Sequence, residues 1–219
     1  MQGRIEEVGE GRATISLPPP FLEEIRRQNI RTMDVYIHDG RRLSDKQRRM
    51  IFATIGDVSL WCGQPPEDLR IWFTWDYCMR VDEDIFSLSP RKDNVASMDT
   101  ARGFITYLLD FCLYHGVPLS EGIMDRADDQ DRALYLCMWH RKCCICGRKA
   151  DIHHVDAIGM GRDRDAIIHT GLPGMALCRV HHTEAESIGK DTFEAKYHVW
   201  GIRMDEALCR HLGLNTRRR

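Results

Sequence analysis

Two short cysteine and histidine pairs constrain the fold of this chain more than any other feature. Cys143 and Cys146 form a CxxC pair, and Cys178 and His181 form a CxxH pair later in the chain. Thiolates three residues apart on a tight turn can bind one tetrahedral ion, and Gly147 can adopt the positive φ that such a turn needs. Two pairs of this kind together predict a closed zinc site with three cysteine ligands and one histidine ligand.

Other interpretations of the cysteines stay open at this point. Cys144 is the alternative to Cys143, although CxC spacing is less usual in zinc sites, and a redox-active CxxC would need a thioredoxin-like βαβ context that the sequence lacks. A disulfide framework is not expected, because the number of cysteines is odd and no export signal precedes them. The cysteines that stand singly in apolar or helical stretches are expected to be small buried residues: Cys62, Cys78, Cys112, Cys137 and Cys209.

Composition narrows the class of protein. Hydrophobic residues make up 43% and charged residues 29% of the chain, as in soluble globular proteins. No apolar run reaches the length that a transmembrane helix needs, and residues 1–10 are charged and lack the apolar core of a signal peptide. We therefore expect a cytoplasmic protein that does not contact a membrane.

Positive charge is concentrated towards the carboxyl end. Residues 131–219 carry 15 Lys and Arg against 11 Asp and Glu, whereas residues 1–130 carry 16 against 22. Eight of the ten histidines also lie in the later part, which ends in three arginines. This distribution suits a polyanion as partner, although the terminal arginines are equally consistent with a solvated, disordered end.

Local patterns predict an α+β fold. Alternating apolar and polar residues predict strands at 12–17 and 33–37. Ser44 and Gln47 form a capping-box pattern at the start of a helix that Gly63 ends. Further helices are expected from Pro65 onward and at residues 101–115, 120–139 and 175–188. The pattern changes near residues 139–143, which predicts an α+β domain at 1–139 and a smaller domain at 140–219.

A second set of polar residues lies between and after the two zinc-binding pairs. A short strand, residues 151–156, carries the adjacent histidines His153 and His154, and the helix that follows presents His182 and Glu186 on one face. Such a strand and helix can surround a second cation with imidazole and carboxylate ligands. Two alternatives stay open: the strand histidines can have a packing or supporting role, and His182 can replace the neighbouring histidine at the zinc.

The order CxxC, His-His, long loop and CxxH followed at once by His resembles the HNH nuclease superfamily in its zinc-bound form, over roughly residues 140–190. In that family a β-hairpin and a helix, the ββα-metal unit, hold one catalytic divalent ion. The resemblance implies that His154 is the general base and that His153 and His182 bind the catalytic ion. Glu186 stands where relatives often place another histidine, which keeps a ligand there but changes its charge.

One position departs from the pattern of that family. The middle asparagine, which orients the base in relatives, is missing, and His169 is the candidate in the loop for this role. The loop at residues 159–165 also carries Arg162 and Arg164 beside glycines, a combination that suits contact with the DNA backbone. A solvated loop with internal Arg–Asp pairs explains the same residues.

Phosphodiester hydrolysis at this domain would need a metal site separate from the zinc site. A neutral imidazole, with an unperturbed pKa of about 6.5, can take a proton from the attacking water, and one hard cation can polarise the phosphate. A zinc ion with four protein ligands has no open position for this chemistry. We therefore expect a closed structural Zn²⁺ site and an open catalytic site for Mg²⁺ or Mn²⁺.

The amino-terminal part carries aromatic residues that can either stack on bases or pack in a core, and we expect them in the core: Trp61, Trp72, Phe73, Trp75 and Tyr77. Residues 33–117 also resemble the phage recombination mediators of the Orf (NinB) type, on the motifs at 42–49 and 55–58 and the run Thr100–Gly116. That resemblance implies a homodimer that binds single-stranded DNA alongside single-strand-binding protein.

These observations lead to the hypothesis of a metal-dependent DNA endonuclease of HNH type. It would act on single-stranded or branched DNA in phage-type recombination or repair, in the cytoplasm of a bacterial host. The alternative is a non-cleaving recombination mediator that binds single-stranded DNA through a zinc-stabilised module. A zinc-mediated protein-interaction module is a third interpretation, but it does not explain the adjacent His153 and His154.

Overall fold

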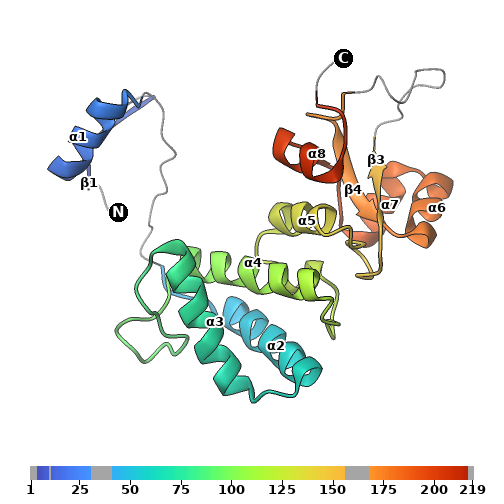
Figure 1. Cartoon of the computed structure of the whole chain (residues 1–219), viewed down its shortest axis with the longest axis horizontal. Coiled ribbons are helices and arrows are strands. Elements are labelled where there is room, and N and C mark those ends of the chain that lie inside the picture. Colours follow the sequence, from blue (N-terminus) through green and yellow to red (C-terminus); the bar gives the residue numbers. More distant parts are fainter. Residues whose placement is uncertain (1–3, 10, 31–40, 156–167, 217–219) are drawn as a thin grey trace. The chain divides into compact units, whose positions relative to one another are not determined.

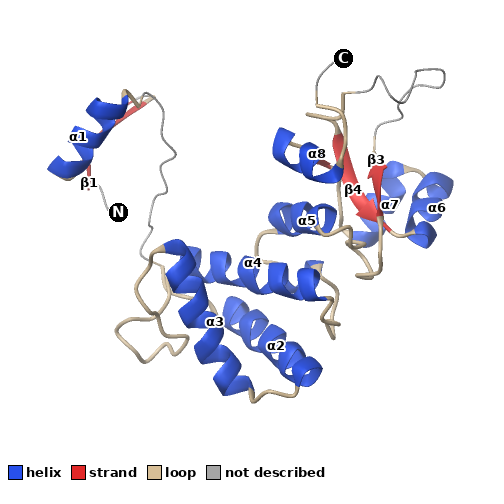
Figure 2. Cartoon of the chain, viewed as in Figure 1, coloured by secondary structure: helices blue, strands red, loops and turns tan. Residues whose placement is uncertain are grey.

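The computed structural model describes residues 4–9, 11–30, 41–155 and 168–216 (Figure 1). The chain divides into two compact units, Met1–Asp39 and Gly40–Arg219. Helices and two small sheets make up the described parts (Figure 2), which agrees with the expected α+β class. The boundary expected between residues 139 and 140 lies within the second unit and stays a prediction. No helix in these ranges combines the length and the apolar character needed to cross a membrane.

The first unit contains a hairpin and one helix. β1 (Arg4–Gly9) pairs antiparallel with β2 (Arg12–Ser16), and α1 (Pro19–Gln28) follows them. The strand expected at residues 12–17 is therefore confirmed. None of the residues of α1 is buried. The strand expected at 33–37 lies outside the described residues.

Three long helices form the first part of the second unit: α2 (Asp45–Cys62), α3 (Pro66–Val81) and α4 (Met98–His115). The capping box of α2 is confirmed, because Ser44 Oγ accepts a hydrogen bond from the Gln47 amide at 3.2 Å and Gln47 Oε1 accepts one from the Ser44 amide at 3.0 Å. α4 begins before the expected residue 101, because the Ser97 hydroxyl caps it by accepting a hydrogen bond from the Thr100 amide.

The aromatic residues expected in the core divide into two groups. Phe73 and Tyr77 are buried, whereas Trp61, Trp72 and Trp75 are 46%, 47% and 54% exposed. The core prediction is wrong for the three tryptophans. α3 carries apolar residues on two faces, only one of which packs against α2 and α4, and Trp61 lies in the last turn of α2. The single cysteines are buried as expected except for the last residue of α2, which is exposed.

The expected helix at residues 120–139 is too long. One 3₁₀ turn, Met124–Arg126, precedes α5 (Gln130–Trp139), and the Asp129 carboxylate starts α5 by accepting a hydrogen bond from the Arg132 amide at 3.0 Å. α5 packs against α4 on one side and against the strand β4 (Pro173–Leu177) on the other (Figure 1). It therefore connects the helical part of the second unit to the sheet.

A three-stranded antiparallel sheet and three short helices complete the second unit. The strands lie in the order β3 (Asp151–His154), β4 and β5 (Ile202–Arg203), and the helices are α6 (Arg179–Ile188), α7 (Lys190–Tyr197) and α8 (Glu206–Leu212). The helix expected at 175–188 is wrong for its first turn, because residues 175–177 pair with β3. A short apolar run fits a buried strand as well as a helix, and here the strand is formed.

A buried ion pair joins α2 to the turn before α5. Arg126 Nη2 donates hydrogen bonds to Asp57 Oδ2 at 3.2 Å and to Ser120 Oγ at 2.7 Å, and the Ser120 amide donates to the same carboxylate at 3.2 Å. The Arg126 and Asp57 side chains are only 4% and 7% exposed. Arg126 Nε also lies 3.2 Å from the exposed Glu121 carboxylate, so Asp57 is the buried one of its two acidic partners. The burial of the Asp57 charge therefore depends on Arg126.

Removing one partner of this pair should destabilise the second unit strongly. Asp57→Ala is expected to lower the free energy of unfolding by about 3 kcal/mol, because it removes the buried counter-charge of the Arg126 guanidinium and leaves it only the exposed Glu121 carboxylate. Glu206→Ala is the matched control, since it removes an exposed partner of Arg210 and should cost less than about 1 kcal/mol. Urea unfolding followed by circular dichroism measures both values, and equal losses would contradict the structural role of the buried pair.

Candidate metal centres

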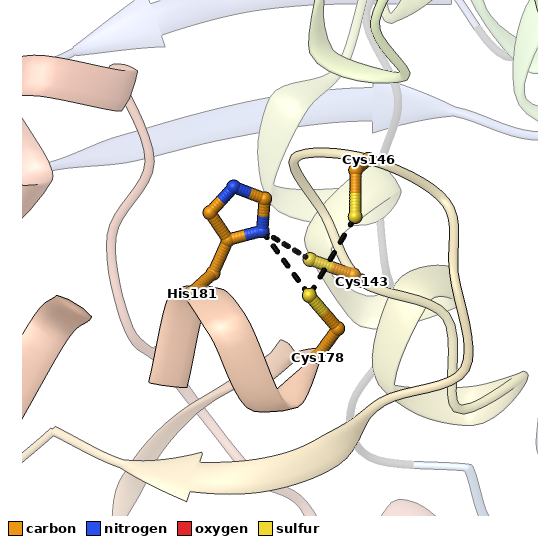
Figure 3. Close-up of side chains that lie close together, drawn as sticks. All are labelled: Cys143, Cys146, Cys178 and His181. Carbon is orange, nitrogen blue, oxygen red and sulfur yellow. Dashed lines mark hydrogen bonds between the residues drawn. The ribbon is translucent and has the colours of Figure 1, made fainter. Parts of the chain in front are cut away.

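A tight turn after α5 carries the CxxC pair. The Cys143 amide donates a hydrogen bond to the Arg148 carbonyl at 2.7 Å, and the Gly147 amide donates one to the Cys143 carbonyl at 2.8 Å. Gly147 has φ +68°, so the left-handed position expected from the sequence is occupied by glycine. The turn brings the Cys143 and Cys146 side chains to the same side, facing the start of α6 (Figure 3).

The CxxH pair lies at the start of α6 and completes a cluster of four side chains. Cys178 precedes the helix and His181 lies in its first turn. The His181 Nδ1 atom lies 3.3 Å from the Sγ atoms of both Cys143 and Cys178, and the Sγ atoms of Cys146 and Cys178 are 3.6 Å apart (Figure 3). In a tetrahedral zinc site with bonds of about 2.3 Å to sulfur and 2.0 Å to nitrogen, neighbouring ligand atoms lie about 3.5–3.8 Å apart. The cluster can therefore hold a zinc ion.

The environment of the cluster also favours a cation. Burial raises the pKa of Cys143 to about 11, so a thiolate at this position needs a positive charge beside it. All four ligand atoms lie within 4.8 Å of one another, and this is the one such group in the described part of the chain. Cys144, the alternative ligand, is not in the group and is almost completely buried in the core. His181 rather than His182 supplies the nitrogen.

The two histidines of β3 contact different partners. The His153 ring lies perpendicular to that of His182 on α6, with ring centroids 4.6 Å apart. His182 Nδ1 in turn lies 3.4 Å from Glu186 Oε1, one helical turn further on. Strand and helix therefore bring together the three residues named for a second cation, although the described residues include no second group as compact as the cysteine cluster.

The other strand histidine, His154, lies beside His169. Their ring centroids are 4.9 Å apart, and within the described structure the Nδ1 atom of each ring is buried without a hydrogen-bond partner. Burial lowers the pKa of His154, and the nearby His169 lowers it further, so the imidazole is neutral at neutral pH. His169 is held in place through its backbone amide, which donates to the Asn215 carbonyl at 2.9 Å. The pair therefore consists of a half-buried His154 and a buried His169, and the pKa of each is lowered by burial.

Two predicted site residues lie outside the described ranges, and one residue that contacts the cluster was not predicted. Arg162 and Arg164 fall in residues 156–167 and lie outside the described ranges. Arg148 was missed, although it contacts two of the sulfur atoms, with Nε donating to Cys146 Sγ at 3.3 Å and Nη2 to Cys178 Sγ at 3.7 Å. Its position directly after the Cys-Gly of the turn is the sequence signal that could have identified it.

Loss of one cluster ligand should prevent zinc binding. The purified protein is expected to contain one zinc ion per chain, and Cys178→Ser should lose it and unfold at a lower urea concentration, because an ion held by the cluster would bridge the turn and α6. Cys144→Ala is the control, since this residue is adjacent to the ligands but outside the cluster. Metal analysis by mass spectrometry checks both, and zinc loss in the control with retention in Cys178→Ser would contradict the assignment.

Comparison with known proteins gives one match. Residues 14–215 match the family described as "Putative HNHc nuclease". No curated protein and no solved structure matches the chain. The resemblance of residues 33–117 to mediators of the Orf type receives no support from these comparisons. Because the match covers most of the sequence and includes the cysteine cluster and both histidine pairs, the chain belongs to this HNHc nuclease family.

Proposed function

We propose that this protein is a metal-dependent DNA endonuclease that hydrolyses phosphodiester bonds at the histidines of β3. The observation that supports this proposal is that the two adjacent histidines of β3 have different ring neighbours, in a chain that belongs to a nuclease family. His153 faces His182, a residue suited to binding metal, while His154 faces His169. Neighbouring strand residues point to opposite faces, so one strand can supply both a metal ligand and a base.

The proposed catalytic ion is Mg²⁺ or Mn²⁺, held by His153, His182 and Glu186. The carboxylate oxygen suits both ions, whereas the two imidazole nitrogens favour Mn²⁺ over the harder Mg²⁺. Three protein ligands would leave positions for water and for a phosphate oxygen. When bound, the ion supplies charge that polarises the phosphate and stabilises the leaving oxygen. The cysteine cluster is proposed to hold a structural Zn²⁺, because four protein ligands leave no open position.

The proposed general base is His154. Its burial keeps the imidazole neutral, so it can accept the proton of the attacking water. His169 takes the orienting role that an asparagine fills in the pattern described above, because its ring contacts that of His154 and its own backbone is anchored. Arg162 and Arg164 are proposed to contact the DNA backbone.

The biological setting is part of the proposal. DNA is the substrate that a nuclease family suggests, and we propose single-stranded or branched DNA processed during phage-type recombination or repair in the cytoplasm of a bacterial host. A homodimer and an interaction with single-strand-binding protein are the partners that the Orf-type resemblance implies. The two domains are proposed at residues 1–139 and 140–219.

A second candidate function is supported by the exposed tryptophans. Trp61, Trp72 and Trp75 leave much of their ring surface open, and exposed aromatic rings are the platforms on which single-stranded bases stack. The chain could therefore bind single-stranded DNA without cutting it, as a recombination mediator. Binding and annealing by a zinc-loaded protein that cleaves no substrate would favour this candidate.

Removal of the proposed base tests the nuclease directly. Plasmid and single-stranded DNA are incubated with zinc-loaded protein and Mg²⁺ or Mn²⁺, with chelator as the metal-free control. His154→Asn should lower the cleavage rate by about 10²-fold to 10⁴-fold. His198→Asn removes an exposed imidazole at φ +52°, a conformation that asparagine tolerates, and should leave the rate unchanged. Absence of cleavage by the folded, zinc-loaded wild type on every substrate would sink the proposal.

Substitution of the two adjacent helix histidines should separate the two metals. His182→Ala is expected to keep zinc but to need a much higher Mn²⁺ concentration for half-maximal cleavage, because one ligand of the open site is lost. His181→Ala should lose zinc, since its Nδ1 atom belongs to the cysteine cluster. Zinc content and Mn²⁺ titrations of cleavage are measured for both variants. Zinc loss in His182→Ala with zinc retained in His181→Ala would reverse the assignment.

A further inference from the structure

Arg148 connects the two halves of the cysteine cluster. Its Nε atom donates to Cys146 Sγ at 3.3 Å, and its Nη2 atom donates to Cys178 Sγ at 3.7 Å. Cys146 belongs to the turn after α5, whereas Cys178 precedes α6. One planar guanidinium therefore reaches sulfur atoms from both pairs, across the same interval that the metal ion would bridge.

The charge of the cluster calls for such a group. Three thiolates and one neutral imidazole around Zn²⁺ leave one net negative charge. Cys146 is exposed, and it lines a cleft of about 430 Å³ together with Lys142 and Arg148. The excess negative charge of the cluster therefore lies at an open side of the protein, where water can reach the sulfur.

We propose that Arg148 is a positioning residue of the zinc site, which neutralises the excess thiolate charge and holds the Cys146 and Cys178 sulfurs together. The fork of the guanidinium suits this role because two N–H groups can contact two acceptors at once. A lysine would keep the charge but could not span both sulfurs in the same way. The proposal rests on zinc binding at the cluster and is independent of DNA cleavage.

The neighbouring lysine provides a matched control. Lys149 is exposed, carries the same charge and follows Arg148 directly, yet Arg148 is the residue whose contacts reach the sulfurs. If positive charge near the turn were sufficient to support zinc binding, loss of either residue would weaken zinc binding to a similar extent. If the contacts with sulfur matter, only Arg148 variants will bind zinc more weakly.

The experiment measures the apparent zinc dissociation constant of the full chain by competition with a chromophoric chelator. Arg148→Gln is expected to raise this constant by about tenfold or more, as is typical when a partner of a metal ligand is lost. Arg148→Lys should give an intermediate value, and Lys149→Gln a value close to the wild type. Absorption spectra of the Co²⁺-substituted proteins report whether three thiolates still bind the ion. Circular dichroism with excess zinc shows whether each variant is folded. If Arg148→Gln does not fold, the zinc dissociation constant of Arg148→Lys is the test instead.

The outcomes distinguish the proposals from one another. A wild-type constant in Arg148→Gln, or in Arg148→Lys where only that variant folds, would overturn the role of Arg148 while leaving the zinc site intact. Equal weakening in Arg148→Gln and Lys149→Gln would overturn it as well, because a general charge effect would then suffice. A wild type that binds no zinc would remove both the zinc site and the role of Arg148.

Discussion

The geometry of the second unit depends on one bridge between a turn and a helix start. The turn after α5 and the first turn of α6 are distant in sequence, and the Cys143, Cys146, Cys178 and His181 side chains converge between them. β3 follows the turn and pairs with β4, which leads directly into α6. A single ion at the cluster would therefore fix the position of the strand histidines relative to the helix histidine. A zinc ion is well suited to this, because four protein ligands hold it in a closed tetrahedral site that contributes folding energy.

The bridge also explains why catalysis is proposed elsewhere. A zinc ion with four protein ligands stabilises the fold but has no open position for substrate. Any metal-assisted hydrolysis must therefore use a second ion held by other residues. The alternation of β3 divides its two histidines between different neighbours, His182 on α6 and His169 before β4. The proposed metal ligand and the proposed base are thus adjacent in sequence but have different ring neighbours. Burial lowers the pKa of His154, which favours the neutral state that can take a proton.

The cysteine cluster and the capping box could be predicted from the sequence, because spacing and local hydrogen bonding determine them. The residues at which β4 and α5 begin could not be predicted from the sequence. Residues 175–177 are apolar in a way that fits strand or helix, and only the pairing with β3 decides. Arg126 has good helix propensity, yet it lies in a 3₁₀ turn, from which it pairs with Asp57 of α2. The exposure of Trp61, Trp72 and Trp75 depends on which face of a helix meets its neighbours, and no local pattern contains that information.

We propose that the protein has two different metal sites, one closed and one open. Electron paramagnetic resonance of Mn²⁺ added to the zinc-loaded protein can decide this, because it measures bound Mn²⁺ while metal analysis measures retained zinc. We expect one Mn²⁺ site that leaves zinc in place and is weakened in His182→Ala. Absence of bound Mn²⁺, or Mn²⁺ that binds only by displacing zinc, would contradict it.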